Sequence, residues 1–285
     1  MTFLKKSRGF TLIELLMVVS VIALLAAMVF NSLRGARESA RISNALSFQH
    51  QMHSLLGADL VGWWNFDEGF GTTTSDLSGH GNNASLSDLT HVGEVLGTAG
   101  SAVNFAGTGA IIVGTSNLFN SNTFTISFWG HYRDYTFPKT FGAIERSSPN
   151  CFQSGGIGWD FGHGFSSSGI GFCIGDGVNR VRSILNFDQG SRPNDLLNKW
   201  TLISFIVDRG NNKAYAFVNG RKQATEIDIS SVTGSISNSS SLVFGTLYGW
   251  QTDAMIDDIR IYSRALTAQE VETLYAQTKG NYVVK

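Results

Sequence analysis

An apolar run near the N-terminus constrains this chain more than any other feature. Residues 10–30 are mostly apolar and contain one ionisable residue, Glu14. About 20 apolar residues are enough to span a bilayer as a helix. Lys5, Lys6 and Arg8 precede the run, and this bias places the N-terminus in the cytoplasm and the remainder outside. A carboxylate in lipid is costly unless it is paired or protonated, so Glu14 is expected to have a function.

Two simpler interpretations of the run are an ordinary membrane anchor and a cleaved secretory signal. A secretory signal has a shorter apolar core followed by a small-residue cleavage site, which Ala23, Ala26 and Ala27 could imitate. The length of the run and the presence of Glu14 both argue against such a signal.

Residues 5–16 read KKSRGFTLIELL, with Gly9 before Phe10 and Glu14 as the fifth residue after Gly9. This pattern closely resembles the start of a type IV prepilin or pseudopilin. The resemblance implies that a prepilin peptidase cuts between Gly9 and Phe10 and that the new amino group of Phe10 is methylated. It also implies that Glu14 pairs with the amino terminus of Phe10 on a neighbouring pilin subunit. Opposite charges in a low dielectric attract strongly and relieve each other's burial cost.

The chain departs from many pilins in having Asn31 where they carry proline. The anchor helix is therefore expected to lack a proline kink. This departure leaves open whether the protein is a major pilin, a minor pilin or a pseudopilin.

The sequence predicts three segments: a leader over residues 1–9, a helix over 10–56 with its transmembrane part at 10–30, and a domain over 57–285. The second half of the helix is amphipathic, so one face is expected to pack on the domain rather than form a free stalk. Its apolar stripe follows a 3-4-3-4 spacing through Ile42, Ala45, Gln49, Met52 and Leu56.

Strand and turn patterns replace the helical pattern from Leu60 onward. Residues 123–129 alternate, with Phe124, Ile126 and Phe128 on one face. Asn219-Gly220 between two strand-like runs is a strong hairpin signal. Thr267 and Glu270 form a capping box for a short C-terminal helix.

Six segments in a fixed order resemble a laminin-G-like, concanavalin-A-type jelly roll. They are WWNFDEGFG at 63–71, DLSGHGNN at 76–83, TFTISFW at 123–129, KWTLISFIVD at 199–208, FVNG at 217–220 and IDDIRIYSRALTAQEV at 256–271. The resemblance implies two antiparallel sheets packed face to face, which bind glycans or proteins and often hold a structural calcium. The match is poor over residues 132–198. The expected fold is therefore α+β: a long N-terminal transmembrane or filament helix, an antiparallel β-sandwich and a short C-terminal helix.

Calcium prefers six to eight oxygen ligands, and the turn at residues 76–83 is rich in side-chain oxygens. The resembled fold brings the first and last strands side by side, so we predict a Ca²⁺ site formed by Asp76, Asn82, Asp257 and carbonyls of the turn. The alternative is that Asp and Asn form Asx-turns there without metal.

Cys151 and Cys173 both follow the membrane segment. Disulfides persist outside the cytoplasm, so we predict a Cys151–Cys173 bridge. Two buried free thiols are the alternative.

Charge and motif content argue against several classes of function. The 21 basic and 22 acidic side chains give a net charge of −1, which does not suit a nucleic-acid-binding surface. Glycosidases need two carboxylates across the scissile bond. The nearest match to the family pattern Glu-x-Asp-x-x-Glu is Glu226 and Asp228, with Ser231 in the third position. We therefore predict that the chain is not an enzyme.

Ligand binding is the better expectation. Candidate binding residues in loop-like stretches are His131, Tyr132, Tyr135, Trp159, Tyr248 and Trp250, since aromatics with a polar tip are favoured at binding surfaces. The alternative is that most of them are core or strand residues.

The sequence thus predicts a pilin or minor pilin with an adhesive head for glycan or matrix-protein ligands. Its expected partners are the prepilin peptidase, other pilin subunits and the membrane. It would lie in the cytoplasmic membrane before assembly and on the cell surface afterwards. A pseudopilin of a type II secretion-like system and an anchored glycan-active enzyme are the alternatives.

Overall fold

The computed structural model describes residues 12–13, 15–23, 56–93, 100–134, 139–140, 143–166, 169–188, 190, 193–245 and 251–282. The chain divides into two compact units, Met1–Ala58 and Asp59–Lys285.

The N-terminal unit is helical over residues 12–13 and 15–23. The large apolar side chains of this helix are exposed, from 48% for Val18 to 76% for Leu12. Of the helices described, none is both long and apolar enough to cross a membrane. Gly9, Phe10, Glu14 and most of the helix predicted over 10–56 lie outside the described residues.

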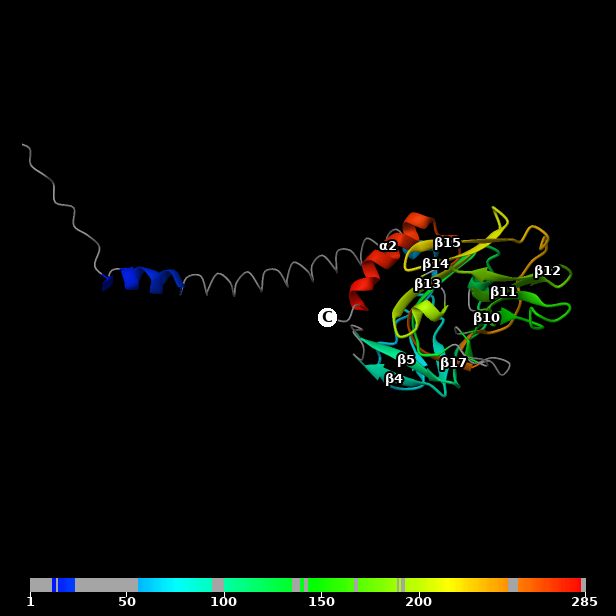
Figure 1. Ribbon diagram of the computed structural model, residues 1–285. Coiled ribbons are helices and arrows are strands. Elements are labelled where there is room, and N and C mark those ends of the chain that lie inside the picture. The colour runs from blue at the N-terminus through cyan, green and yellow to red at the C-terminus, as the bar shows by residue number, and fades with distance from the viewer. Residues whose placement is uncertain are drawn as a thin grey trace, which may run out of the picture. The chain divides into compact units, whose positions relative to one another are not determined.

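The second unit is a β-sandwich of two antiparallel sheets, as the sequence predicted (Figure 1). Sheet A contains, in spatial order, β15 (Arg221–Asp228), β14 (Lys213–Val218), β13 (Trp200–Asp208), β7 (Phe124–Tyr132), β17 (Gln251–Tyr262), β5 (Ser101–Ala106) and β4 (Thr90–Gly93). The strands β1 (Leu60–Trp64) and β8 (Lys139–Thr140) also pair with β17, the latter in parallel.

Sheet B forms the second layer, with β10–β12 separated from β13–β15 in Figure 1. Its strands are β12 (Arg180–Asn186), β11 (Gly169–Asp176), β10 (Ile157–Ser166), β9 (Ala143–Ser147), β16 (Leu242–Gly245), β6 (Ala110–Val113), β3 (Ala84–Ser87) and β2 (Thr73–Thr74). The helical segments of this unit and its border are η1 (Gly57–Asp59), η2 (Asn117–Asn120), η3 (Pro193–Leu196), α2 (Ala268–Thr278) and η4 (Lys279–Asn281).

The core lies between the two sheets and is rich in aromatic side chains. Phe124, Ile126 and Phe128 of β7 all enter it, which confirms the predicted face of residues 123–129. The ring of Phe161 from sheet B stacks on Phe205 from sheet A at 4.4 Å between centroids. Burial of this apolar surface is the main contribution that holds the layers together.

Two local signals are confirmed in the fold. Asn219 and Gly220 have φ of 51° and 77°, the left-handed pair that a tight hairpin between β14 and β15 requires. The amide N of Thr267 donates to Glu270 Oε2 at 2.8 Å, and the amide N of Glu270 donates to Thr267 Oγ1 at 3.3 Å. This is the predicted capping box at the start of α2.

An aromatic stack attaches the C-terminal segment to the outer face of sheet A. The indole of Trp129 stacks on Tyr282 at 4.1 Å between centroids and on Tyr275 of α2 at 5.9 Å. Its Nε1 donates to Thr278 Oγ1 at 3.0 Å. The ring centroid of Trp200 lies 5.1 Å from that of Tyr282. The stack on Tyr275 and Tyr282 leaves Trp129 only 2% exposed, although the Trp129 side chain points away from the sandwich core.

An ion-pair cluster joins the first residues of the second unit to α2. Arg264 contacts Asp59 Oδ2 at 2.6 Å and Glu270 Oε1 at 2.7 Å. The hydrogen bonds from Arg264 lower the pKa of Glu270 to about 2. Because these side chains are about a third exposed, solvent screens the pairs and they add little to stability.

Candidate binding face beside the disulfide

A row of polar side chains crosses the outer face of sheet B. Glu145 of β9 lies opposite Asp160 of β10, Asp160 lies opposite Cys173 of β11, and Cys173 lies opposite Arg182 of β12. Side chains on a strand alternate between faces, and neighbours such as Phe161 enter the core. The four side chains therefore share the outer face.

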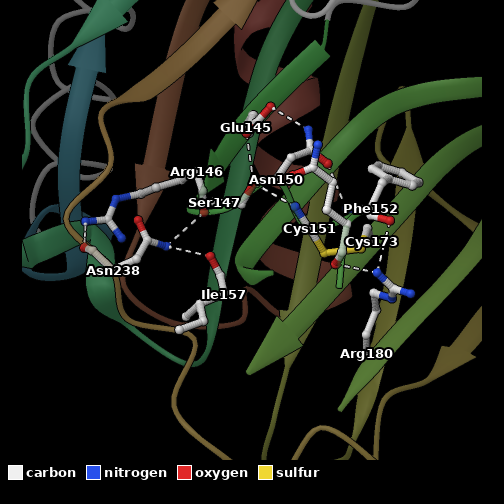
Figure 2. Close-up of a disulfide and its surroundings, with 11 residues drawn as sticks. Glu145, Arg146, Ser147, Asn150, Cys151, Phe152, Ile157, Cys173, Arg180 and Asn238 are labelled. Carbon is white, nitrogen blue, oxygen red and sulfur yellow. Dashed lines mark hydrogen bonds between the residues drawn. A yellow bond between two sulfur atoms is a disulfide. The ribbon is translucent and has the colours of Figure 1, made fainter. Parts of the chain in front are cut away.

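The Cys151–Cys173 disulfide is present, which confirms the prediction. It attaches residues 148–156 to the outer face of sheet B, as Figure 2 shows. Ser147 Oγ donates to Glu145 Oε1 at 2.8 Å and accepts from the amide N of Cys151 at 3.0 Å. Glu145 and Asp160 consequently are only 5% and 0% exposed despite facing outward.

Asn238 fixes the two strands beneath this loop. Its Nδ2 donates to the carbonyls of Arg146 and Ile157 at 3.1 and 3.2 Å, and Arg146 Nη2 returns a bond to the Asn238 carbonyl at 2.8 Å (Figure 2). Gly158 has φ of +120°, and a Cβ there would lie 2.0 Å from the Arg146 carbonyl. These contacts hold β9 and β10 in register, which places Glu145 beside Asp160.

The rim of this face is cationic and aromatic. Arg180 Nη1 donates to the Phe152 carbonyl at 3.0 Å and also to the Gln153 carbonyl (Figure 2). The guanidinium of Arg182 lies 4.9 Å from the centre of the Phe152 ring. Both arginines are exposed. Arginine and an aromatic ring at one surface can hydrogen-bond and stack with a ligand.

No sequence motif points to Glu145, Asp160, Arg180 or Arg182 as binding residues. Alternation was visible only around Asp160, which lies between Trp159 and Phe161; the charged Arg146 directly after Glu145 hides it in the other segment. That pattern indicates an outward carboxylate on a strand. The burial of such a carboxylate depends on residues 148–156, which the disulfide places over the sheet. Alternation within a strand does not reveal that loop.

The predicted calcium residues are only partly brought together. Asp76 accepts from the amide N of Asn82 at 2.9 Å. Its other oxygen accepts from the amides of Trp63 and Ser78 at 3.0 and 2.9 Å. These are the bonds of the alternative interpretation, an Asx-turn.

Asp257 has different partners from the other two predicted ligands. Its Oδ2 accepts from the Tyr282 hydroxyl at 2.7 Å, and its Oδ1 accepts from the amide N of Asp258 at 2.6 Å. Among the described residues no group of three His, Cys, Asp or Glu side chains could hold a metal. Asp76 and Asn82 thus bond within one turn while Asp257 bonds to Tyr282 and Asp258, and calcium binding stays a prediction.

Replacing Asp257 with asparagine tests that prediction. Burial raises the pKa of Asp257 well above its ordinary value, and the Asp258 carboxylate adds to the rise. Because the pKa of Asp257 is higher in the folded than in the unfolded state, the protonated group contributes its full stabilisation below the unfolded-state pKa. That contribution is lost as the pH rises through the folded-state pKa. We therefore expect Asp257→Asn to raise Tm at pH 7 by ~2–4 °C, equivalent to ~1 kcal/mol, and to flatten the Tm profile between pH 4 and 8. If Asp257 binds calcium, the variant would instead lower Tm, and EDTA would lower the wild-type Tm.

The predicted binding aromatics are mostly buried where the structure describes them. His131, Tyr132 and Trp159 are 7%, 0% and 2% exposed. Tyr132 and Trp159 belong to the core, and His131 lies outside it on β7 beside Trp200, so the alternative of core or strand residues holds for these three. Tyr135, Tyr248 and Trp250 lie outside the described residues.

Glu226 and Asp228 lie exposed on β15, at one edge of sheet A. Lys222 Nζ donates to Glu226 at 2.5 Å and lowers its pKa. The amide N of Ser230 donates to Asp228 and lowers its pKa. A general acid in a glycosidase needs a raised pKa, so neither residue resembles one.

Removing the disulfide is expected to destabilise the sandwich. The double substitution Cys151→Ala and Cys173→Ala opens a loop of sequence separation 22. In the chain-entropy model a loop of this size contributes ~3 kcal/mol, and solvent would also reach Glu145. Urea unfolding of the oxidised wild type and the double variant measures the loss. The reduced wild type is the matched control and should lose a similar amount; an unchanged midpoint in both would contradict the expectation.

Comparison with known proteins agrees with this architecture. The model of the concanavalin A-like lectin/glucanases superfamily matches residues 105–272, and that of the prokaryotic N-terminal methylation motif matches residues 4–30. No curated protein matches the chain by sequence.

Several solved structures share the fold at low sequence identity. The binding domain of Paraclostridial Mosquitocidal Protein 1 has 19% identity and a TM-score of 0.60, over 77% of this chain and 52% of that one. The binding domain of botulinum neurotoxin DC, solved with rat synaptotagmin II, has 18% identity and a TM-score of 0.56, over 78% and 52%. Domain 4 of AbnA, a GH43 extracellular arabinanase from Geobacillus stearothermophilus solved with arabinotriose, has 18% identity and a TM-score of 0.55, over 76% and 98%.

The chain spans about half the length of the toxin binding domains that it matches. At these identities the similarity shows the fold alone. The superfamily match, in contrast, covers more than half of the 285 residues. This chain therefore belongs to the concanavalin A-like lectin/glucanases superfamily, with a prokaryotic N-terminal methylation motif at its start.

Proposed function

We propose that the chain is a pilin or minor pilin of a type IV pilus-like filament and that its β-sandwich is an adhesive head. One observation carries this proposal: an N-terminal methylation motif at residues 4–30 and a lectin-like domain at 105–272 lie in the same chain. The motif would direct the chain to the membrane and into the filament, and the domain would provide a surface that binds ligands.

The assembly steps follow the motif. A prepilin peptidase cleaves after Gly9, the amino group of Phe10 is methylated, and Glu14 pairs with that group on a neighbouring subunit. The helix over residues 12–13 and 15–23 supports this role because its apolar side chains are exposed around it. A helix that is apolar on all sides is stable in lipid or among other helices.

The head is proposed to bind a glycan or a protein at the face beside the disulfide. The exposed Arg180 and Arg182 with the ring of Phe152 supply hydrogen-bond donors and an aromatic surface there. Similar folds were solved with arabinotriose and with synaptotagmin II, so the proposal includes both ligand classes.

Binding without catalysis is the proposed activity. Glu145 and Asp160 are neighbouring carboxylates on sheet B, as a glycosidase would need. However, they are buried, and Ser147 and Asn150 donate to Glu145. Glu226 and Asp228 have lowered pKa values on an exposed edge. These observations favour a structural role for both pairs.

Immunogold imaging of cells with antibody to the head tests the filament role. We expect label along surface filaments. Label confined to the cell envelope, with secretion lost on deletion, would support a pseudopilin instead.

Binding of the full-length chain in detergent to glycan and matrix-protein arrays tests the adhesive role. The double variant Arg180→Ala and Arg182→Ala should lose at least about tenfold in affinity, since hydrogen bonds to charged groups contribute ~1.5–3 kcal/mol. Arg221→Ala is the matched control, because Arg221 is 71% exposed on β15. Equal affinity of both variants would place the ligand elsewhere, and hydrolysis of an array glycan would contradict the non-catalytic proposal.

A further inference from the structure

The first strand of the head occupies a mechanically special position. Residues before Asp59 belong to the N-terminal unit, so any pull on that unit reaches the head through Asp59 and then β1. On one edge β1 pairs with β17, where Trp63 lies opposite Arg260 and Trp64 lies opposite Ile259. Four residue pairs, with a register shift between Leu60 and Gly62, are a short attachment for a strand under tension.

The other edge of β1 is bonded to the turn at residues 76–83, which we call the clasp. The amide N of Trp63 donates to Asp76 Oδ1 at 3.0 Å, and the carbonyl of Trp63 accepts from the amide N of Leu77 at 2.8 Å. The carbonyl of Val61 accepts from Asn82 Nδ2 at 2.9 Å. Val61 and Trp63 therefore bond to the clasp, while alternate residues of β1 face β17.

The clasp is itself held together by one carboxylate. Asp76 accepts from the amides of Trp63, Ser78 and Asn82, all within 3.0 Å. The amide N of Asp76 donates to Asn83 Oδ1 at 3.0 Å, and Trp64 Nε1 donates to the Asn82 carbonyl at 3.0 Å. Hydrogen bonds from backbone amides to a carboxylate are charge-assisted and stronger than neutral ones.

The entry point of the strand is fastened as well. The amide N of Ser263 donates to the Asp59 carbonyl at 2.8 Å, and Arg264 Nε donates to Asp59 Oδ2 at 2.6 Å. The bonds on both edges of β1 run across the strand. A pull along the strand loads them together in shear, whereas a pull across it would break them one at a time.

We propose that the clasp bears tension, so that a head holding a ligand stays folded when its N-terminal segment is pulled. This inference rests on the proposed function, because a chain anchored at its N-terminus and bound at its head is loaded through β1. It assigns a role to the sequence DLSGHGNN that requires no metal.

Single-molecule pulling of the full-length chain in detergent tests the proposal. One handle is a tag at the N-terminus. The other is attached at Thr108→Cys, an exposed position beside the far end of β17, where the amide N of Gly107 donates to the Thr252 carbonyl. Cys151 and Cys173 are already paired, so the new thiol takes the handle.

Asp76→Ala and Asp176→Ala form a matched pair in this experiment. Asp176 also accepts from three backbone amides, those of Val178, Asn179 and Gly234, but none belongs to β1. We expect both variants to lower Tm similarly. At constant force, only Asp76→Ala should speed unfolding, by at least about tenfold. This is the effect expected from losing the one charge-assisted bond that Asp76 makes to β1, the bond from the amide N of Trp63.

Equal unfolding rates under force for the two variants would overturn the proposal. So would a wild-type rate for Asp76→Ala. If that variant does not fold, Asn82→Ala replaces it; it removes the bond to Val61 and keeps the carboxylate, and the same outcomes apply. These results do not depend on ligand or filament assays, so a failed clasp and a failed adhesin are distinguishable.

Discussion

Replacing Glu14 with alanine is expected to exclude the chain from filaments while leaving it in the membrane. In the proposed function this carboxylate pairs with the amino group of Phe10 on the neighbouring subunit. Without it that amine would be buried and unpaired, which costs about 3–5 kcal/mol. Such a loss corresponds to more than a hundredfold in incorporation.

Blotting of sheared filaments and membranes with antibody to the head measures the partition. Ser20→Ala is the matched control, since Ser20 lies in the same helix and its Oγ donates to the Met17 carbonyl at 2.8 Å. Mass spectrometry of the wild-type protein should find a methylated Phe10 as its first residue. Normal incorporation of the Glu14 variant, or recovered protein that still begins at Met1, would contradict the pilin-like assignment of function.

Replacing Trp129 with alanine is expected to destabilise the head by ~3–5 kcal/mol, which is the usual cost of removing a buried tryptophan. The change removes the surface on which Tyr275 and Tyr282 stack and the donor to Thr278. We therefore expect α2 to detach from sheet A at lower urea concentrations than the rest of the sandwich.

Urea unfolding followed by tryptophan fluorescence and by amide exchange in α2 measures the two effects. Trp129→Phe is the control that keeps a ring and loses the hydrogen bond, so it should cost ~1 kcal/mol. A loss below ~1 kcal/mol for Trp129→Ala, or unchanged exchange in α2, would show that the stack does not hold the helix.

The parts of the fold that sequence predicted depend on local signals. Asn219-Gly220 is a turn because of its own backbone preference, and Thr267 caps α2 through bonds within one helical turn. The alternation of residues 123–129 required only a sheet with one apolar face. The disulfide followed from having two cysteines outside the membrane and one possible pairing.

The different partners of Asp257 and of the turn residues Asp76 and Asn82 follow from a bulge that no local pattern reveals. The register of β17 against β7 shifts between Asp257 and Arg260, and Asp258 has φ of 49°. A shift of one residue exchanges the faces of a strand. With this shift, Asp258 Oδ1 accepts a hydrogen bond from Trp63 Nε1 at 2.7 Å, and Asp257 Oδ2 accepts one from the Tyr282 hydroxyl.

The candidate binding face was missed for a different reason. Residues 148–156 have no strand pattern, and the bond to Cys173, together with hydrogen bonds to Ser147 and Arg180, places them over Glu145 and Asp160. Burial of an outward carboxylate is thus a property of two distant segments together. Sequence alternation describes one segment at a time.

The position of Tyr282 between Trp129 and Trp200 has a practical consequence for labelling. A fluorescent protein fused directly after this ring would compete with the indoles for the same space and loosen α2. The tip between β13 and β14, where Gly210 and Asn211 are exposed, offers an insertion site away from this stack. Live imaging of the proposed filaments should therefore carry its dye at that tip.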